Sequence, residues 1–326
     1  MKELQKEPLR IGIIGCGNFI VERVLPLIRD LDNIHVVSIQ NRNTAKGKEI
    51  AGRFSIPQFV LKREDLLENP LVDAVYIASP NFIHEQDLEL CAKYGKPTLC
   101  EKPLAICAKS VERLLDIFNN LKIPLFVAHQ QRFNPAVQKA KELIEEGAIG
   151  QIQYFRAYYL TKSQPPSDQW RMKKGNGGGA LQEIGIHLID LIHFISGEEI
   201  SSARGFSIPY AEGVDLITFA EGKLSKGAGF SLKCGYSLPY ENGFEIFGTQ
   251  GYLASPGSLR SNELGSALYF FRKNGERKEF SFPFKNLYFE ELRHFAKVIV
   301  EKIPSFISAN TSLNNQKVID SIYKTL

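Results

Sequence analysis

The sequence of 326 residues lacks the features that mark several classes of protein. Its five cysteines form no CxxC pair and no cysteine–histidine cluster at zinc-ligand spacing, so we expect no metal site and a reduced, cytosolic compartment. No uninterrupted apolar run approaches the length that crosses a bilayer. Residues 1–8 are charged and hold no apolar signal core, so we expect a soluble cytoplasmic protein that associates with no membrane.

A strong charge of one sign is also missing. The 40 basic and 36 acidic residues leave a formal charge of +4, and no basic stripe is interleaved with aromatic residues, which argues against binding of nucleic acid. The composition, 44% hydrophobic and 23% charged, is ordinary for a soluble globular protein. Because a chain of this length exceeds the usual size of a domain with a single hydrophobic core, we expect two domains.

Strand-like and helix-like segments alternate in the first part of the chain, residues 1–128. Short apolar runs typical of buried parallel strands occupy residues 9–14, 34–39, 72–78, 97–100 and 125–128. Amphipathic segments typical of helices lie between them, at residues 21–28, 45–54, 84–94 and 110–120. This alternation predicts a doubly wound parallel sheet of the Rossmann type.

The pattern changes in residues 129–326. Strand-like alternation with glycine and proline turns surrounds one strong helix at residues 181–195, and two more helices are expected near 288–302 and from 313 onward. This predicts a second, α+β domain with a mainly antiparallel sheet. The last helix is a candidate to pack back on the first domain.

The first expected strand ends in a turn with a glycine pattern. Gly15 permits a tight bend, and Gly17 lets the backbone approach a pyrophosphate. Asn18 and Phe19 then begin a helix, whose first N–H groups and positive dipole end favour an anion. Ile20 replaces the third glycine of the usual fingerprint. The turn, Gly15-Cys16-Gly17-Asn18-Phe19-Ile20, predicts a dinucleotide site; a purely structural turn is the alternative.

The end of the second expected strand bears on the choice of cofactor. An acidic residue there binds the ribose 2′-hydroxyl of NAD, whereas an arginine accommodates the 2′-phosphate of NADP. This chain has Asn41 and then Arg42. We therefore predict a preference for NADP(H), with NAD(H) as the other cofactor; Arg42 as a solvated turn residue is the alternative.

A lysine follows the fourth expected strand, in the sequence Glu101-Lys102-Pro103. Pro103 restrains the backbone of Lys102 toward extended geometry, so its side chain leaves the strand end in a defined direction. A lysine there can donate to a substrate oxygen and stabilise the alkoxide that develops during hydride transfer. The alternative is a plain surface ion pair between Glu101 and Lys102.

A second cluster of polar residues lies in the strong helix, directly after three glycines. Glu183 and His187 are four residues apart and share a helix face, with Asp190 one turn beyond. The imidazole of His187 is suited to exchange a proton with a carbinol, although a histidine packed in the core is the alternative. Trp170 and Arg171, before the glycines, either line a sugar pocket or belong to packing and surface.

Together these segments resemble the glucose-fructose oxidoreductase / inositol dehydrogenase (Gfo/Idh/MocA) family of NAD(P)-dependent oxidoreductases over nearly the whole chain. Besides the glycine turn, the resemblance rests on four runs, which are Val72 to Asn81 with His84, Gly95-Lys96-Pro97 leading into Glu101-Lys102-Pro103-Leu104-Ala105, Arg132-Phe133-Asn134-Pro135, and Gly177 to Asp190. It implies hydride transfer between a nicotinamide and a carbinol or carbonyl of a sugar, polyol or sugar derivative. It also implies a substrate-binding second domain whose open sheet face commonly supports homodimers or homotetramers.

The resemblance implies a role for each matching residue. Lys102 would contact the reacting hydroxyl and the nicotinamide ribose, and His187 would act as general acid/base. Glu183 stands where aspartate is usual, so its longer side chain reaches the same point only after a shift. The Lys102–Pro103 bond is expected to be cis, as is frequent in the family. The remaining expected contacts are Ser79, Pro80, Asn81, His84 and Glu101 for the cofactor, and Arg132, Trp170, Arg171, Glu183 and His187 for the substrate.

Two other functions remain open. One is an NAD-dependent glycoside hydrolase of the same family, which recycles a tightly held NAD within each turnover; Arg42 argues against it. The other is a catalytically silent, cofactor-binding regulator, suggested by Glu183 in place of aspartate. The presence of both Lys102 and His187 argues against that function.

Overall fold

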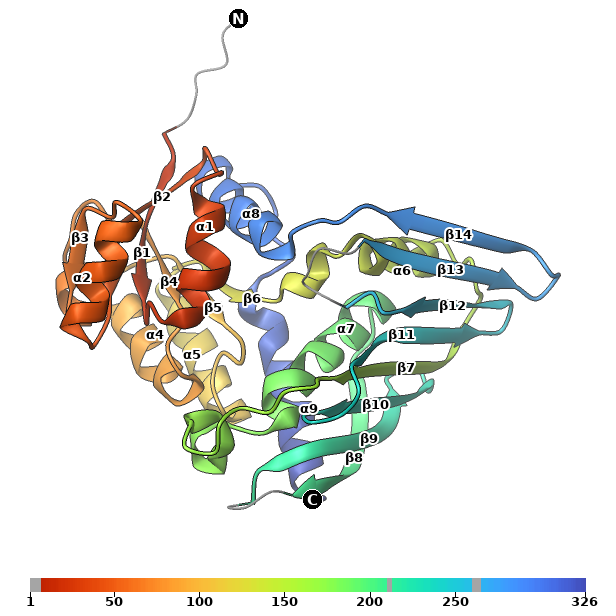
Figure 1. The fold of residues 1–326 in the computed structure, drawn as a ribbon. Coiled ribbons are helices and arrows are strands. Elements are labelled where there is room, and N and C mark those ends of the chain that lie inside the picture. Colours follow the sequence, from red (N-terminus) through yellow and green to blue (C-terminus); the bar gives the residue numbers. More distant parts are fainter. Residues whose placement is uncertain (1–6, 210–212, 260–264) are drawn as a thin grey trace, which may run out of the picture. The chain divides into compact units, whose positions relative to one another are not determined.

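The computed structural model describes residues 7–209, 213–259 and 265–326, and the chain divides into two compact units (Figure 1). The first unit holds residues 1–105, 109–128 and 288–310, and the second holds residues 106–108, 129–287 and 311–326. The chain therefore passes out of the first unit, returns to it, and ends in the second.

The first unit is built on a six-stranded parallel sheet in the order β3-β2-β1-β4-β5-β6. The order reverses between β1 and β4, where open α/β sheets bind ligands beyond the carboxyl ends of their strands. The predicted Rossmann sheet is confirmed. Its strands are β1 (Leu9–Ile14), β2 (Ile34–Gln40), β3 (Gln58–Val60), β4 (Ala74–Ile77), β5 (Thr98–Glu101) and β6 (Leu125–Ala128).

Helices cover this sheet because each carries an apolar stripe. In α5 the buried residues Val111, Leu114, Leu115 and Phe118 recur at helical spacing. A π-helical turn, Ile20–Val24, runs into the short α1. The helices are α1 (Leu25–Ile28), α2 (Thr44–Arg53), α3 (Arg63–Leu67), α4 (His84–Lys93), α5 (Ala108–Asn120) and α8 (Leu287–Glu301).

The second unit is built on an eight-stranded sheet in the order β14-β13-β12-β11-β7-β10-β9-β8. Among its described residues only the central pair β7–β10 is parallel, so the predicted mainly antiparallel sheet is confirmed. Its strands are β7 (Ile152–Leu160), β8 (Ile200–Pro209), β9 (Asp215–Leu224), β10 (Gly229–Gly235), β11 (Glu241–Gly248), β12 (Gly251–Pro256), β13 (Ser266–Arg272) and β14 (Arg277–Phe282).

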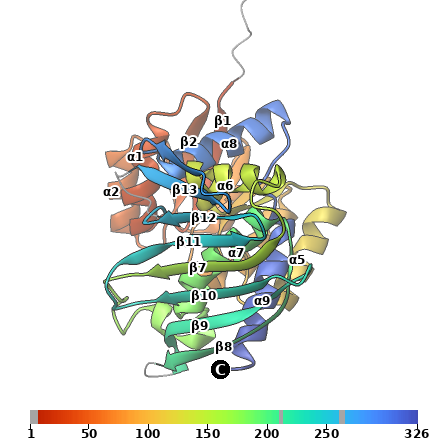
Figure 2. The same cartoon turned by 90° about the vertical axis from the view of Figure 1, so that its right-hand side faces the viewer.

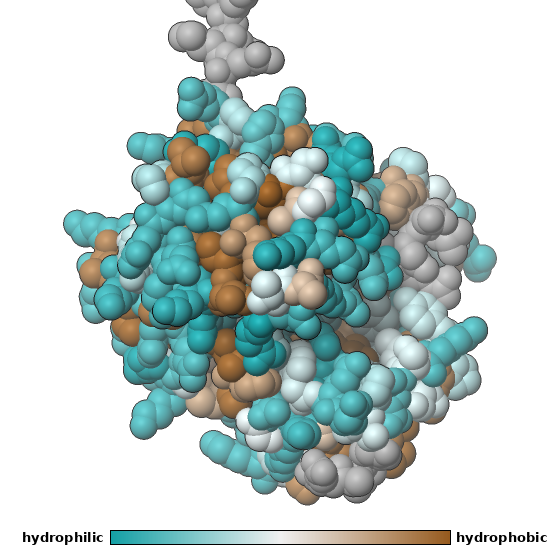
Figure 3. Space-filling view, turned by 60° about the vertical axis from the view of Figure 1, so that its left-hand side comes forward, coloured by the Kyte–Doolittle hydropathy of each residue, from teal (hydrophilic) through white to brown (hydrophobic). Residues whose placement is uncertain are grey.

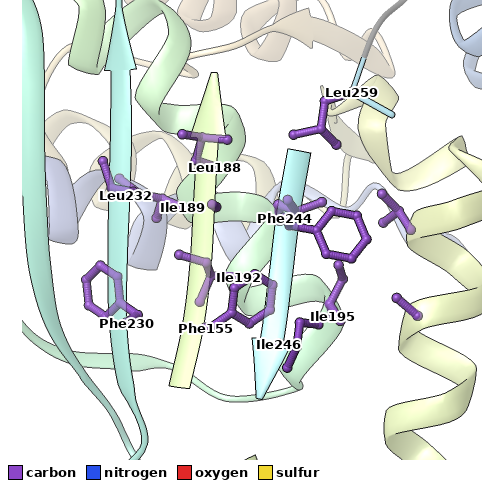
Figure 4. Close-up of a cluster of buried hydrophobic side chains, with 14 of the residues drawn as sticks. Phe155, Leu188, Ile189, Ile192, Ile195, Phe230, Leu232, Phe244, Ile246 and Leu259 are labelled. Carbon is purple, nitrogen blue, oxygen red and sulfur yellow. The ribbon is translucent and has the colours of Figure 1, made fainter. Parts of the chain in front are cut away.

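One face of this sheet carries the hydrophobic core of the second unit. In Figure 2 the strands face the viewer and the helices α6 (Pro135–Glu145), α7 (Ile186–Ser196) and α9 (Ser312–Tyr323) lie behind them. Figure 4 shows Phe155, Phe230 and Phe244 of the sheet beside Ile189 and Ile192 of α7. Each such side chain contributes about 1.5–3 kcal/mol through burial.

The last helix contributes its apolar stripe to the core of the second unit. The buried residues Val318, Ile319 and Ile322 place α9 in the core of the second unit, and Ser321 Oγ donates to Ala203 O of β8 at 3.1 Å. The segment that returns to the first unit is α8, where the rings of Phe295 and Phe126 of β6 meet edge-on at 5.5 Å. Helical period alone predicts an apolar stripe and leaves open which core receives it.

The surface in Figure 3 is mostly hydrophilic, with hydrophobic side chains in small patches. Among the described residues, every helix is too short or too polar to span a bilayer.

Candidate active site

The glycine turn lies at the carboxyl end of β1. Gly15 has φ +78°, and a Cβ there would lie 2.5 Å from the Ser79 backbone nitrogen, so only glycine fits. A Cβ on Gly17 would meet only Gly15 O, at 3.7 Å, which leaves that side of the turn open to a ligand. Val21 N–H donates to Gly17 O at 3.1 Å, so the three N–H groups before it precede the first helical bond. These features fit a pyrophosphate.

The side chains around this turn hold its backbone. Gln40, the buried last residue of β2, accepts from Gly15 N–H at 3.2 Å and donates to Leu61 O at 2.9 Å. Asn41 Nδ2 donates to Cys16 O at 2.6 Å. The Phe19 ring packs edge-on against the Tyr288 ring, with the ring centres 5.6 Å apart. Phe19 therefore contributes its backbone to the turn, while its ring packs elsewhere in the first unit.

Two cations lie just after β2. Arg42 is exposed, directly after Asn41, and Lys46 of α2 donates through Nζ to Asn18 Oδ1 of the glycine turn. The second cation therefore links the end of β2 to the pyrophosphate turn. Lys46 was not among the predicted site residues.

The carboxyl ends of β4 and β5 bring further predicted residues to the same edge of the sheet. In the register, Ile14 pairs with Ile77, and Ile77 pairs with Cys100, so the turns after β1, β4 and β5 follow one another along that edge. At the usual strand spacing, Lys102 follows a strand that lies about 10 Å from β1. The edge thus carries the turn and the lysine together.

The residues around Lys102 are mostly enclosed. Lys102 itself is half-buried, and the Lys102–Pro103 bond is cis, as expected. Glu101 accepts from the hydroxyl of Tyr76 at 2.7 Å, and burial together with Glu101 raises the pKa of Tyr76. Glu101 is thereby linked to the neighbouring strand β4.

The turn after β4 is held by buried side chains. Ser79 Oγ donates to Asp87 Oδ2 at 2.5 Å, and Pro80 leads into a 3-10 turn, Asn81–Ile83, that runs into α4. Asn81 is buried, and so is His84, whose ring contacts two backbone carbonyl groups.

In the second unit, three predicted residues come together. The Arg171 guanidinium lies 4.4 Å from the centre of the Trp170 ring, and its Nε donates to Glu183 Oε2 at 2.9 Å. The carboxylate at the end of the longer Glu183 side chain therefore forms an ion pair with Arg171. The Tyr236 hydroxyl, directly after β10, lies near enough to Glu183 and Arg171 for both charges to act on it. Burial, and to a smaller extent the negative charge of Glu183, raises the pKa of Tyr236.

Tyr236 is a residue that the sequence analysis missed. Its side chain is buried, and among the described residues its hydroxyl has no hydrogen-bond partner. A buried hydroxyl without a partner is costly in a pure core and useful where a polar ligand completes the bond.

His187 lies one residue into α7 and is 9% exposed. The five residues before α7, Leu181–Gly185, form a π-helical turn rather than the α-helix expected there. Asp215 holds the start of this turn by accepting from Leu181 N–H at 2.7 Å, from Thr218 Oγ1 at 2.7 Å and from the Tyr323 hydroxyl at 2.9 Å. A π-turn inside a helix is frequent at functional sites.

Arg132 and Asp190 form a buried pair. Arg132 Nε donates to Asp190 Oδ2 at 2.9 Å, and its Nη2 donates to Thr311 Oγ1 at 2.7 Å. Asn315 Nδ2 donates to Asp190 Oδ1 at 2.9 Å. Arg132 is only 4% exposed, and these contacts fix its guanidinium inside the second unit.

Comparisons with known proteins show to which protein family this chain belongs. The family model described as the oxidoreductase family, NAD-binding Rossmann fold, matches residues 9–129, and the GFO/IDH/MocA C-terminal domain matches residues 137–254. The chain belongs to the Gfo/Idh/MocA family. The family resemblance inferred from the motifs is thereby confirmed, and the chain is an NAD(P)-dependent oxidoreductase.

Relatives within the Gfo/Idh/MocA family act on different sugars and polyols. A dTDP-3,4-didehydro-2,6-dideoxy-alpha-D-glucose 3-reductase of Saccharopolyspora spinosa is 27% identical, over 90% of this chain and 88% of the relative. A myo-inositol 2-dehydrogenase of Thermotoga maritima is 26% identical, over 92% and 91% of the two chains. The crystal structure of a 3-ketoreductase from Actinomadura kijaniata, in complex with NADP and TDP-benzene, covers 98% of both chains with a TM-score of 0.87 and 25% identity.

Membership of the Gfo/Idh/MocA family accounts for the glycine turn of the first unit. The open side of Gly17 and the N–H groups before Val21 would hold the pyrophosphate of the dinucleotide. Gln40 and Asn41 hold the backbone of that turn through hydrogen bonds to Gly15 and Cys16.

Proposed function

We propose that this chain transfers a hydride between NADP(H) and a carbinol or carbonyl carbon of a sugar, polyol or sugar derivative. The observation that carries the proposal is the position of Lys102 at the same sheet edge as the glycine turn, directly after β5. When bound, the nicotinamide accepts the hydride in one direction and supplies it in the other.

The preference for NADP(H) rests on the residues after β2. Asn41 stands where a carboxylate would otherwise bind the ribose 2′-hydroxyl, and the exposed Arg42 that follows it can take up a 2′-phosphate. Lys46, held at Asn18, adds a second positive charge close to the same end of the strand. The solved 3-ketoreductase complexed with NADP supports this choice.

The proton and the developing charge are assigned to two side chains. During oxidation, His187 takes the proton of the carbinol hydroxyl, and Lys102 donates a hydrogen bond to the oxygen while negative charge develops on it. During reduction, the same groups return the proton and polarise the carbonyl. In the direction of oxidation, one carbinol and one NADP⁺ give one carbonyl, one NADPH and one proton.

The substrate contacts are assigned to the cluster in the second unit. Glu183, oriented by Arg171, can accept from sugar hydroxyls, and the Trp170 face can pack against a ring. The Tyr236 hydroxyl offers a further bond to a polar substrate. We propose these roles for a small molecule of the sugar class, without choosing among its members.

The test is a turnover screen with NADPH and NADH over sugars, polyols and sugar nucleotides in both redox states. We expect Lys102→Ala and His187→Ala each to lower kcat by about 100-fold or more, while His187→Ala keeps its affinity for NADP(H). The control variants Lys109→Ala and His35→Ala, both at exposed positions, should leave kcat unchanged.

The same screen separates the alternatives. Near-normal turnover by both active-site variants would refute the assignment. NAD that co-purifies, with glycoside cleavage and no net change in NAD(P)H, would favour the hydrolase. Tight cofactor binding without turnover of any substrate would favour the regulator.

We further propose that a second copy of this chain covers the outer face of the eight-stranded sheet. That face carries a stacked pair, Phe206 and Phe219, with ring centres 4.9 Å apart, and Phe206 is 64% exposed. Cross-strand pairs of opposite charge, such as Arg204 with Glu221, lie beside these rings. A hollow of about 510 Å³ lies on the same face. A surface with both signs of charge and exposed rings is suited to pair with itself.

A further inference from the structure

His84, the first residue of α4, lies between two turns at the functional edge of the Rossmann sheet. Its side chain is fully buried. Its Nδ1 lies 2.7 Å from Pro103 O, after β5, and its Nε2 lies 2.8 Å from Ser79 O, after β4. Both distances are those of good hydrogen bonds.

Both of these carbonyl groups are acceptors. A carbonyl oxygen has lone pairs and no proton, so each contact requires an N–H on the imidazole. A neutral imidazole carries only one N–H, and its other nitrogen would point a lone pair at a carbonyl lone pair. Only the doubly protonated ring satisfies both contacts.

His193, on α7 of the second unit, shows the opposite arrangement. Its Nε2 accepts from Ile200 N–H at 3.0 Å, and its Nδ1 lies 2.8 Å from Asn315 Oδ1. One acceptor and one donor suit a neutral ring, and burial lowers the pKa of His193. The hydrogen-bond partners of these two buried histidines therefore indicate a charged ring for His84 and a neutral ring for His193.

We propose that His84 is a buried imidazolium and a positioning residue, which ties the turn before Asn81 to the turn that carries Lys102. The second part rests on the proposed function, because it concerns the presentation of Lys102. The contact with Pro103 O is one residue after Lys102, so the ring fixes the backbone on which that lysine is mounted.

A buried anion lies close to this cation. Asp87, three residues on in α4, is fully buried; it accepts from Ser79 Oγ and pairs with Arg63 of α3. The same serine therefore links His84, through its carbonyl, to Asp87, through its hydroxyl. The titratable groups on the elements around the start of α4 include Glu85, Asp87 and Glu89 on α4, Arg63 on α3, Arg113 on α5, Tyr76 on β4, and Cys100, Glu101 and Lys102 on or after β5.

The charge is measured on the wild-type protein by NMR with ¹⁵N-labelled histidine at pH 7.5, about one unit above an ordinary histidine pKa. The six histidines give a spectrum in which we expect one ring to keep both nitrogens protonated. His84→Gln should remove that signal, and the control His35→Gln, at an exposed position, should leave it. A spectrum without a doubly protonated ring at this pH overturns the proposal, whether or not the variant folds.

The positioning role is measured by kinetics. A glutamine side chain has a donor group at one end only, so one of the two turns is released in His84→Gln. We expect kcat to fall by about 10- to 100-fold, with the KM for NADP(H) changed much less. Unchanged kcat in a folded His84→Gln protein overturns the positioning role. If Lys102→Ala retains activity, the proposed function fails, while the NMR measurement still decides the charge of His84.

Discussion

The buried pair of Arg132 and Asp190 gives the sharpest test of the structure. Both side chains are at most 5% exposed, and Asp190 accepts from Arg132 and from Asn315. In Asp190→Asn the guanidinium stays buried without its counter-charge, and the new amide directs an N–H toward one of the former donors. Removing one partner of a buried pair destabilises a protein by about 3–5 kcal/mol.

This loss is large against a typical stability of about 5–15 kcal/mol. The only tryptophan, Trp170, belongs to the second unit and reports its unfolding by fluorescence. At a urea slope of about 2–3 kcal/mol/M, the midpoint should fall by about 1–2.5 M. The double variant Arg132→Met with Asp190→Asn should recover part of the loss, because no uncompensated charge remains.

The control is Glu276→Gln, which breaks the exposed pair with Arg272 and should change the stability by less than about 1 kcal/mol. Burial opposes ionisation of Asp190, but Arg132 and His129 outweigh it and hold its pKa below the usual 3.8. Because the pKa of Asp190 is lower in the folded state than in the unfolded chain, the ionised carboxylate stabilises the fold at pH values above 3.8. This stabilisation is lost as the pH falls below that value. The difference between wild type and Asp190→Asn should therefore shrink below about pH 4. A loss under 1 kcal/mol at pH 7 would refute the reasoning.

Four further outcomes are expected. Arg42→Ala should raise the KM for NADPH about tenfold and leave that for NADH unchanged in steady-state assays; equal effects on both would contradict the assignment. Gly179→Ala, at φ +112° with its Cβ 2.1 Å from Asp215 Oδ1, should lower the thermal midpoint by several degrees, unlike Gly175→Ala, where the Cβ meets open space. Tyr236→Phe should leave the urea midpoint nearly unchanged but raise the substrate KM; an unchanged KM excludes the contact. Phe206→Glu should convert a dimer to a monomer in light scattering, and a wild-type monomer would refute the proposed interface.

The Rossmann sheet was predictable because it contains strands, such as β4 and β6, that are apolar throughout. All four residues of β4 and of β6 are buried, and such runs stand out among amphipathic helices. The short β3 and α3 were missed because three- and five-residue elements hold too few positions to show a period. Helix α6 was missed as well, although Asn134 caps it and Pro135 begins it, signals that the chain does display.

The sequence proposes candidate site residues where the chemistry of a side chain stands out from its surroundings. Lys102 and His187 attract notice because a cation after a strand and an imidazole in an apolar helix need a reason. Arg132 also attracted notice, but its partner Asp190 is 58 residues away, and the sequence cannot show that the two charges neutralise each other. The π-helical turn before His187 was missed for a related reason, because Asp215, which holds its start, lies 34 residues from Leu181.

The turn-holding contacts that sequence reasoning missed share a physical cause. Gln40, Asp215 and His84 bind backbone N–H or carbonyl groups of turns that are distant in the chain. A contact of this kind leaves no complementary side chain for a sequence pattern to reveal, because every residue offers the same backbone groups. In each case the turn it holds carries or leads into a predicted functional residue, namely Gly17, Glu183 or Lys102. The chemistry of the site is therefore visible in the sequence, while the means that keep its turns in place become visible only in the fold.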